Sequence, residues 1–156
     1  MKKIKLLLLI FLTLNLYSSD IDFDKIIKQS KEQNKQIMVF FHMKHCPWCH
    51  KMIDDSLKDE NIMNQIKKDF IYVSIDVENK NKLIYNKKSI NKIDFARKYN
   101  IHFYPTTLMF DDMIVVQRIR GYRNKQKFEN IVKYIATKSN KNMTLKEFIV
   151  DLEFEK

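Results

Sequence analysis

The sequence predicts an α/β protein in which strands alternate with helices. Two short, continuous apolar runs rich in β-forming residues, at 36–42 and 70–77, have the length of buried strands. Segments with helical spacing or helix-capping residues lie between and after them. A further pair of β-like runs, joined by a turn, follows Pro105 and predicts a hairpin. The predicted order is β, α, β, α, β, β, α.

The N-terminal stretch MKKIKLLLLIFLTLNLYSS has the pattern of a secretory signal peptide. Three lysines precede an apolar run from Leu6 to Leu12, and small polar residues follow. The run is shorter than the roughly 20 residues of a membrane span. We expect cleavage after Ser18, which assigns residues 1–18 to the signal peptide and 19–156 to one soluble, periplasmic domain. An uncleaved tether is the alternative.

The chain is basic, with 29 lysines and arginines against 19 acidic residues and a formal net charge of +10. Removal of the three lysines of the signal peptide lowers this charge to +7. The remaining lysines are scattered and form no basic stripe with interleaved aromatic residues. This pattern is typical of a solvated surface, and we expect no nucleic-acid partner.

The first half of the domain contains three predicted helices and a strand. Residues 21–33 have amphipathic spacing and predict a short helix. The strand at 36–42 follows. A second helix is predicted over 47–57, because its leading proline can occupy the first helical turn, where no N–H is needed. Asp59 is a suitable N-cap for a third helix that ends near Lys68.

The strand at 70–77 is followed by a polar, lysine-rich stretch at 78–92 that has no clean period, which we interpret as an exposed insertion. A helix is predicted over 92–99. After Pro105 we expect a strand, a turn at Asp111-Asp112 and a hairpin partner. Gly121, the single glycine, indicates a bulge or a left-handed backbone. Two further helices are predicted, with N-termini at Asn124 and Thr144.

Both cysteines lie in the sequence Cys46-Pro47-Trp48-Cys49-His50. In an exported protein they could form a structural disulfide. However, a bridge across so short a loop would contribute only on the order of 2 kcal/mol, so a redox pair explains the spacing better. The turn from strand to helix places Cys46 at a helix N-terminus. There the free N–H groups and the helix dipole stabilise a thiolate.

Three other chemistries fit part of this pattern. Cys-x-x-Cys-His is also the attachment motif of covalent haem, with His50 as axial ligand, but here the motif follows a buried strand in a β-rich chain. A structural zinc site normally needs two ligand pairs, and the chain has only one pair of cysteines, so we expect no metal. The last alternative is a binding module with an inert disulfide.

With these elements in place, the chain resembles the thioredoxin superfamily, and most closely its exported members associated with periplasmic thiol reduction. The matching segments are KQIMVFFH, HCPWCHKM, FIYVSIDV, YNIHFYPTTLMF and the hairpin end RGY. The family places a cis-proline opposite its cysteine pair, and Pro105 in YPT matches that position. The resemblance implies a thioredoxin fold, with a central mixed sheet flanked by helices.

The resemblance also implies the roles of the site residues. Cys46 is the expected nucleophile and Cys49 the resolving cysteine, with no cofactor beyond their disulfide. Lys44, Lys51 and His45 are expected near Cys46, where they would favour its thiolate. Substrate contacts are expected from Pro47, Trp48, Tyr104 and Pro105, with His102 bordering the groove. The alternative for each of His42, His45, His50 and His102 is an ordinary surface histidine.

Two departures from the family pattern bear on the direction of electron flow. Thioredoxins carry a buried acid six residues before the first cysteine, and this chain has Phe40 there. The Pro-Trp dipeptide resembles the Pro-Tyr of glutaredoxins more than the Gly-Pro of thioredoxin. We expect a monomeric reductase of protein disulfides that receives electrons from a membrane thiol-disulfide donor. An oxidant of the same fold is the alternative.

Overall fold

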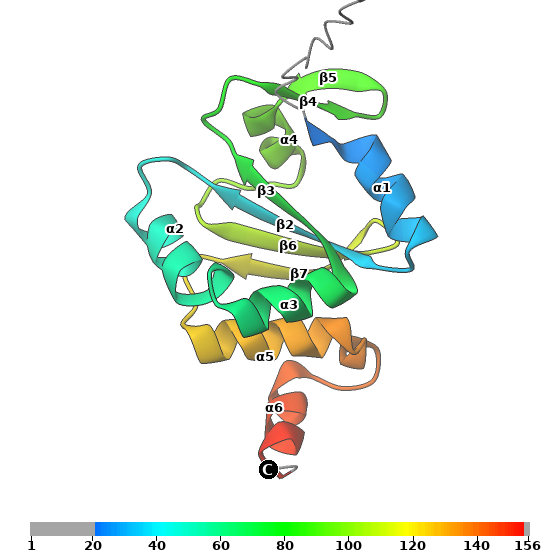
Figure 1. The fold of residues 1–156 in the computed structure, drawn as a ribbon, viewed down its shortest axis with the longest axis vertical. Helices are drawn as coiled ribbons and strands as arrows, with labels where there is room; N and C mark the ends of the chain where they lie inside the picture. The colour runs from blue at the N-terminus through cyan, green and yellow to red at the C-terminus, as the bar shows by residue number, and fades with distance from the viewer. Residues whose placement is uncertain (1–20, 155–156) are drawn as a thin grey trace, which may run out of the picture.

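The structure is a computed structural model that describes residues 21–154. The predicted signal peptide, residues 1–18, therefore lies outside the described residues. Within 21–154, no helix combines the length and the apolar character that a membrane crossing requires. The described part of the chain forms one α/β unit around a four-stranded sheet (Figure 1).

The central sheet is mixed and has the strand order β3-β2-β6-β7. β2 (Gln36–His42) pairs in parallel with β3 (Phe70–Asp76) and antiparallel with β6 (Thr106–Asp111). β6 continues into its antiparallel neighbour β7 (Ile114–Arg120). The two apolar runs and the hairpin are thus strands as predicted, and the mixed sheet that the resemblance implies is confirmed.

β2 is buried on both faces, which explains its unbroken apolar sequence. Ile37, Val39 and Phe41 belong to the core on one side of the sheet, here called the first core. Met38 and Phe40 alternate with them and belong to the core on the other side, the second core. Because successive side chains of a strand point to opposite faces, one apolar run supplies both cores.

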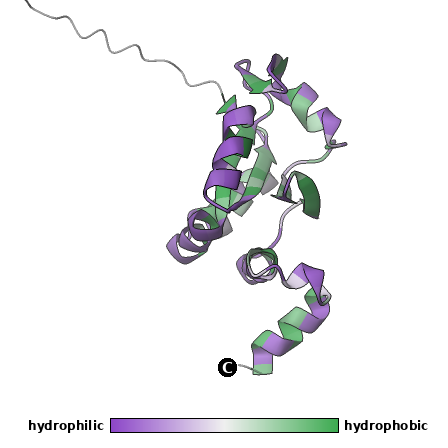
Figure 2. Ribbon diagram, turned by 90° about the vertical axis from the view of Figure 1, so that its right-hand side faces the viewer, coloured by the Kyte–Doolittle hydropathy of each residue, from purple (hydrophilic) through white to green (hydrophobic). Residues whose placement is uncertain are grey.

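Helices cover both faces of the sheet (Figure 1). α1 (Phe23–Glu32) and α4 (Lys92–Lys98) contribute to the first core. α3 (Glu60–Asp69) and α5 (Lys125–Ala136) contribute to the second. The last helix, α6 (Leu145–Phe154), packs on α5 and projects away from the sheet (Figures 1 and 2).

Three predicted helix starts are confirmed by their hydrogen bonds. Asp59 accepts from the backbone N–H of Ile62 over 3.1 Å at the start of α3. Asn124 accepts from Lys127 over 3.0 Å at the start of α5. At α6 the Thr144 hydroxyl and the Glu147 carboxylate bond reciprocally to each other's backbone N–H groups. Each cap satisfies backbone donors that a helix leaves unpaired.

The helix predicted over 47–57 consists of two parts. α2 (Pro47–Met52) is regular, and the chain then passes into a π-helical turn, Ile53–Leu57. The N–H of Lys58 donates to the Ile53 carbonyl over 2.8 Å, five residues back, instead of four. Hydrophobic spacing does not predict this change, because it does not indicate which carbonyl accepts each N–H.

The stretch at 78–92, interpreted above as an exposed insertion without a clean period, contains regular structure. It contains a hairpin of β4 (Lys82–Tyr85) and β5 (Lys88–Asn91), and β4 also pairs in parallel with β1 (Ile21–Asp22). Most of its side chains are exposed, but Leu83 is fully buried in the first core. The turn at Asn86-Lys87 has positive φ at both residues, a conformation that lysine does not signal in a sequence.

The end of the β6–β7 hairpin lies beside the start of β6. The predicted turn falls one residue later than expected, since Asp112 and Met113 are the residues with positive φ. Gly121 has the predicted left-handed backbone, with φ +76°. Its N–H donates to the Pro105 carbonyl over 2.7 Å. Within residues 21–154, a Cβ at this position would have no heavy atom within 4 Å beyond Gly121 and its chain neighbours, so the backbone angle alone favours glycine.

Candidate active site

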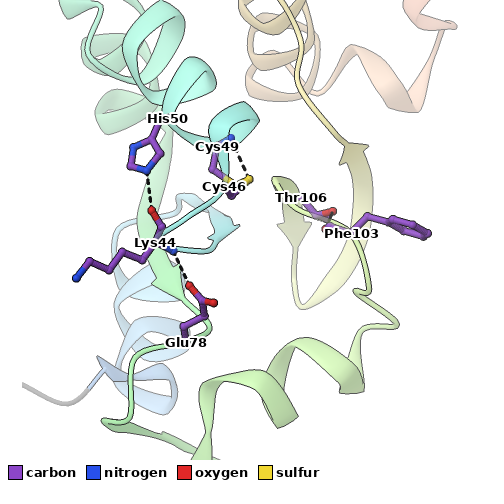
Figure 3. The surroundings of a disulfide bond; sticks show 7 residues. All are labelled: Lys44, Cys46, Cys49, His50, Glu78, Phe103 and Thr106. Carbon is purple, nitrogen blue, oxygen red and sulfur yellow. Dashed lines mark hydrogen bonds between the residues drawn. A yellow bond between two sulfur atoms is a disulfide. The ribbon is translucent and has the colours of Figure 1, made fainter.

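The two cysteines form a disulfide at the N-terminus of α2. Cys46 is the N-cap residue, and its Sγ accepts a hydrogen bond of 3.1 Å from the backbone N–H of Cys49 (Figure 3). Pro47 occupies the first helical turn, as predicted. An N-cap side chain accepts from free helical N–H groups, so this position stabilises negative charge on the Cys46 sulfur.

The two sulfurs differ in their access to solvent. Cys46 is partly exposed, whereas Cys49 is only 1% exposed. A partner can therefore reach Cys46 but not Cys49. This difference matches the expected order, in which Cys46 reacts first and Cys49 attacks from inside the protein.

The turn between β2 and α2 is held by two contacts of Lys44. Its backbone N–H donates to the Glu78 carboxylate over 2.8 Å. Its carbonyl lies 2.7 Å from Nε2 of His50, and Figure 3 shows the His50 ring directed to this carbonyl. His50, which was interpreted as a surface residue, is exposed but has this specific partner.

Lys51, expected to favour the Cys46 thiolate, has other partners. Its Nζ is 3.0 Å from the Asp55 carboxylate and 5.3 Å from the centre of the Tyr122 ring. These contacts raise the pKa of Lys51, mainly through the hydrogen bond to Asp55. No sequence pattern described above singles out Asp55 or Tyr122 as a site residue.

His42 is half-buried at the end of β2, whereas His45 and His102 are exposed. The His42 ring stacks on Phe40, and its Nε2 lies 3.0 Å from the hydroxyl of Ser74. Burial lowers the pKa of His42, against the opposing effect of Asp76. Phe40 is fully buried, so the position that holds an acid in thioredoxins contributes only apolar packing here.

The loop before β6 lies beside the disulfide (Figure 3). The Tyr104–Pro105 peptide bond is cis, which agrees with the position of Pro105 in the family pattern. The hydroxyl of Thr106 donates to the Phe103 carbonyl over 2.8 Å and closes the loop. Pro105 is buried, while the side chain of Phe103 is 70% exposed.

A groove of about 370 Å³ opens next to these elements. Trp48 and Tyr104, two of the predicted substrate contacts, line it, whereas Pro47, Pro105 and His102 are not among its lining residues. Trp48 is 58% exposed, so it is available to a partner. The other lining residues follow β7: Gly121, Tyr122 and Arg123.

The RGY segment matches the family hairpin, but the sequence alone assigns these residues no role in the site. Tyr122 packs on Trp48, with ring centres 5.6 Å apart, although 74 positions separate them in the chain. Only the return of β7 to the edge of α2 brings them together. The sequence feature that could have pointed to Tyr122 is its position directly after the single glycine, Gly121.

Within residues 21–154, no group of three or more histidine, cysteine or acidic side chains is placed to hold a metal ion. The site instead consists of a Cys-x-x-Cys disulfide at a helix N-terminus, a cis-proline loop beside it and an adjoining groove. In an α/β fold with a mixed sheet, this combination defines the thiol–disulfide oxidoreductases, and the Cys46–Cys49 disulfide is the redox group.

The chain belongs to the Thioredoxin-like domain family, whose sequence model matches residues 23–136. A search of curated proteins found no match. Among solved structures, a thioredoxin from Thermus thermophilus is 20% identical, with a TM-score of 0.61, and the match covers 76% of this chain and 86% of that one.

A thioredoxin-fold protein from Helicobacter pylori is 16% identical, with a TM-score of 0.65 and coverage of 78% and 86%. A structure described as DsbH oxidoreductase is 18% identical, with a TM-score of 0.58 and coverage of 77% and 86%. At these identities the similarities support the fold alone.

Proposed function

We propose that this protein is an exported reductase of protein disulfides, active in the periplasm as a monomer. The predicted signal peptide supports export. The observation that carries the catalytic assignment is the unequal exposure of the two sulfurs, with Cys46 accessible at the helix N-terminus and Cys49 buried behind it.

The reduced protein begins the reaction. The Cys46 thiolate attacks one sulfur of a substrate disulfide, forms a mixed disulfide and displaces the other substrate sulfur as a thiolate. Cys49, as a thiolate, then attacks Sγ of Cys46, which forms the Cys46–Cys49 bond and releases the second substrate thiolate. Two electrons pass to the substrate, and the structure described here corresponds to the oxidised product.

A new cycle requires a dithiol that reduces the Cys46–Cys49 disulfide. We propose that a membrane thiol-disulfide protein supplies these two electrons and itself becomes oxidised. The reductase direction rests on the resemblance to exported thiol-reducing proteins. An oxidant of the same fold would run the same two exchanges in reverse, and the reduction potential distinguishes the two.

Covalent haem attachment would use the same residues differently. Each cysteine sulfur would have to bond to the haem, and His50 would have to turn to the iron. The sulfurs bonded to each other, and the His50 ring held at the Lys44 carbonyl, support thiol chemistry instead. A visible absorption band of a haem in the purified protein would overturn this assignment.

The deciding measurement is the reduction potential of the Cys46–Cys49 pair, obtained by titration against a dithiol buffer. Fluorescence of Trp48, the single tryptophan, reports the redox state, and thiol trapping checks it. A potential near that of thioredoxin, about −270 mV, supports a reductase. A potential near about −120 mV, that of a strong disulfide oxidant, would show that the proposed direction is wrong.

A further inference from the structure

The π-helical turn after α2 brings a carboxylate to the loop that follows β7. Asp55 lies in this turn, and its Oδ2 accepts a hydrogen bond of 2.5 Å from the hydroxyl of Tyr122. The two residues are 67 positions apart, so the bond joins separate parts of the fold. We call this pair the Asp55–Tyr122 latch.

Two further contacts hold the same junction. The Nζ of Lys51 lies 3.0 Å from the Asp55 oxygen that Tyr122 also contacts, and it also lies over the Tyr122 ring. The backbone N–H of Arg123 donates to the Met52 sulfur over 3.4 Å. The segment after β7 is therefore attached to α2 and its π turn through both side chains and backbone.

The latch reaches the groove through one aromatic contact. The Tyr122 ring packs on Trp48, with a centre-to-centre distance of 5.6 Å and an angle of 37° between the rings. Both residues line the groove beside the disulfide. Since the Tyr122 hydroxyl is bonded to Asp55, its ring has a defined position against which Trp48 rests.

We propose that Asp55 and Tyr122 are positioning residues that hold the Trp48 side of the groove, and thereby increase the affinity of this protein for polypeptide disulfides over small disulfides. This inference rests on the proposed function. We infer no role for the latch in thiol exchange itself. A polypeptide that extends from its disulfide into the groove meets Trp48 and Tyr122, whereas a small disulfide needs only Cys46.

The neighbouring residue Asp54 supplies a matched control. It lies in the same π turn and forms the same kind of i,i+4 ion pair, with Lys58 at 2.7 Å, while its side chain is 60% exposed. Asp55 pairs in this way with Lys51 and additionally bonds to Tyr122. Exposed ion pairs contribute little to stability, so Asp54→Ala and Asp55→Ala should differ mainly through the latch.

The experiment compares Asp55→Ala, Asp55→Asn, Tyr122→Phe and Asp54→Ala with the wild type. KM and kcat are measured with insulin as the protein disulfide and with glutathione disulfide as the small one. We expect Asp55→Ala and Tyr122→Phe to raise KM for insulin by about three- to tenfold, the usual effect of losing one hydrogen bond. Asp55 does not line the groove, so Asp55→Ala should keep the wild-type rate with glutathione disulfide and the wild-type reduction potential.

Two further readouts separate positioning from general damage. Asp55→Asn keeps an acceptor oxygen for the Tyr122 hydroxyl, so its KM should lie between those of Asp55→Ala and the wild type. Acrylamide quenching of Trp48 should increase in Tyr122→Phe and Asp55→Ala, and stay unchanged in Asp54→Ala. This measurement needs no turnover.

Equal KM values for Asp55→Ala, Tyr122→Phe and Asp54→Ala would overturn the role of the latch in binding protein substrates, while leaving the proposed function intact. A parallel loss of activity with both disulfides, or a shifted potential, would also overturn it, because the residues would then affect the chemistry. If the wild-type protein reduces neither insulin nor glutathione disulfide, the proposed function fails, and the inference that rests on it fails as well.

Discussion

The backbone N–H of Cys49 donates a 3.1 Å hydrogen bond to Sγ of Cys46. The bond links the two residues of the disulfide and places the reactive sulfur where the first helical turn has free donors. Since Cys49 is itself buried, the same turn separates an accessible sulfur from a protected one.

The two cysteine variants should fail in different ways. Cys46→Ser should abolish disulfide reduction, because no accessible thiolate remains. Cys49→Ser should still attack substrates but should accumulate mixed disulfides, since no internal thiol can resolve them. Non-reducing gel electrophoresis after acid quenching checks both. A folded Cys49→Ser protein that traps no partner would contradict the scheme.

Removing the exposed indole of Trp48 should selectively weaken the binding of protein substrates. Trp48→Ala deletes a side chain that is 58% exposed and lines the groove, so it should raise KM for insulin with little change for glutathione disulfide. Phe103→Ala is the control, because Phe103 is 70% exposed yet is not among the groove-lining residues. Similar KM values for insulin in the two variants would argue against the groove as a binding surface.

The hairpin of β4 and β5 should be part of the stable core. Leu83 is fully buried, so Leu83→Ala should lower the free energy of unfolding by about 2–5 kcal/mol, the usual range for a buried leucine. Ile84 is the next residue of β4 and is 36% exposed, so Ile84→Ala should cost about 0.5 kcal/mol or less. Urea denaturation measures both, and equal losses would contradict the assignment.

His42 should make the protein less stable in mild acid. Burial lowers its pKa below the ordinary 6.5, so the folded state favours the neutral ring. The stabilisation is complete above pH 6.5 and is lost as the pH falls from there through the lowered pKa, because the unfolded chain binds the proton first. Asp76, Lys92 and His50 are the charged groups that also act on this ring.

Urea midpoints measured from pH 7.5 down to pH 5 test this expectation. The wild type should lose stability across this interval, and His42→Gln should lose less. His45→Gln, which alters an exposed histidine in the next turn, should follow the wild type. Parallel curves for the wild type and His42→Gln would show that another group causes the acid sensitivity.

Much of the fold was predictable because its signals are local. The apolar run at 36–42 is long enough to identify a strand buried on both faces, and Asp59, Asn124 and Thr144 each identify a helix start. The hairpin at 82–91 was not predictable in this way. Leu83 is its only fully buried residue, and Asn86 and Lys87, both with positive φ, form its turn.

The candidate site also has one part that local sequence determines and one part that depends on tertiary contacts. Local sequence determined the redox chemistry: the Cys-x-x-Cys spacing, the strand before it and Pro47 in the first helical turn place Cys46 at a helix N-terminus. Pro105 was identified through the resemblance. These features depend on spacing within a few residues, or on a motif that can be recognised in the sequence itself.

Only the tertiary structure decided the surroundings of the disulfide. Asp55 meets Tyr122 because the segment after β7 lies against the π turn, and Tyr122 meets Trp48 because β7 returns the chain to α2. The sequence contains these residues but not their distances. Contacts between positions about 70 residues apart depend on the packing of the whole sheet, whereas a cap or a Cys-x-x-Cys motif depends on one helical turn.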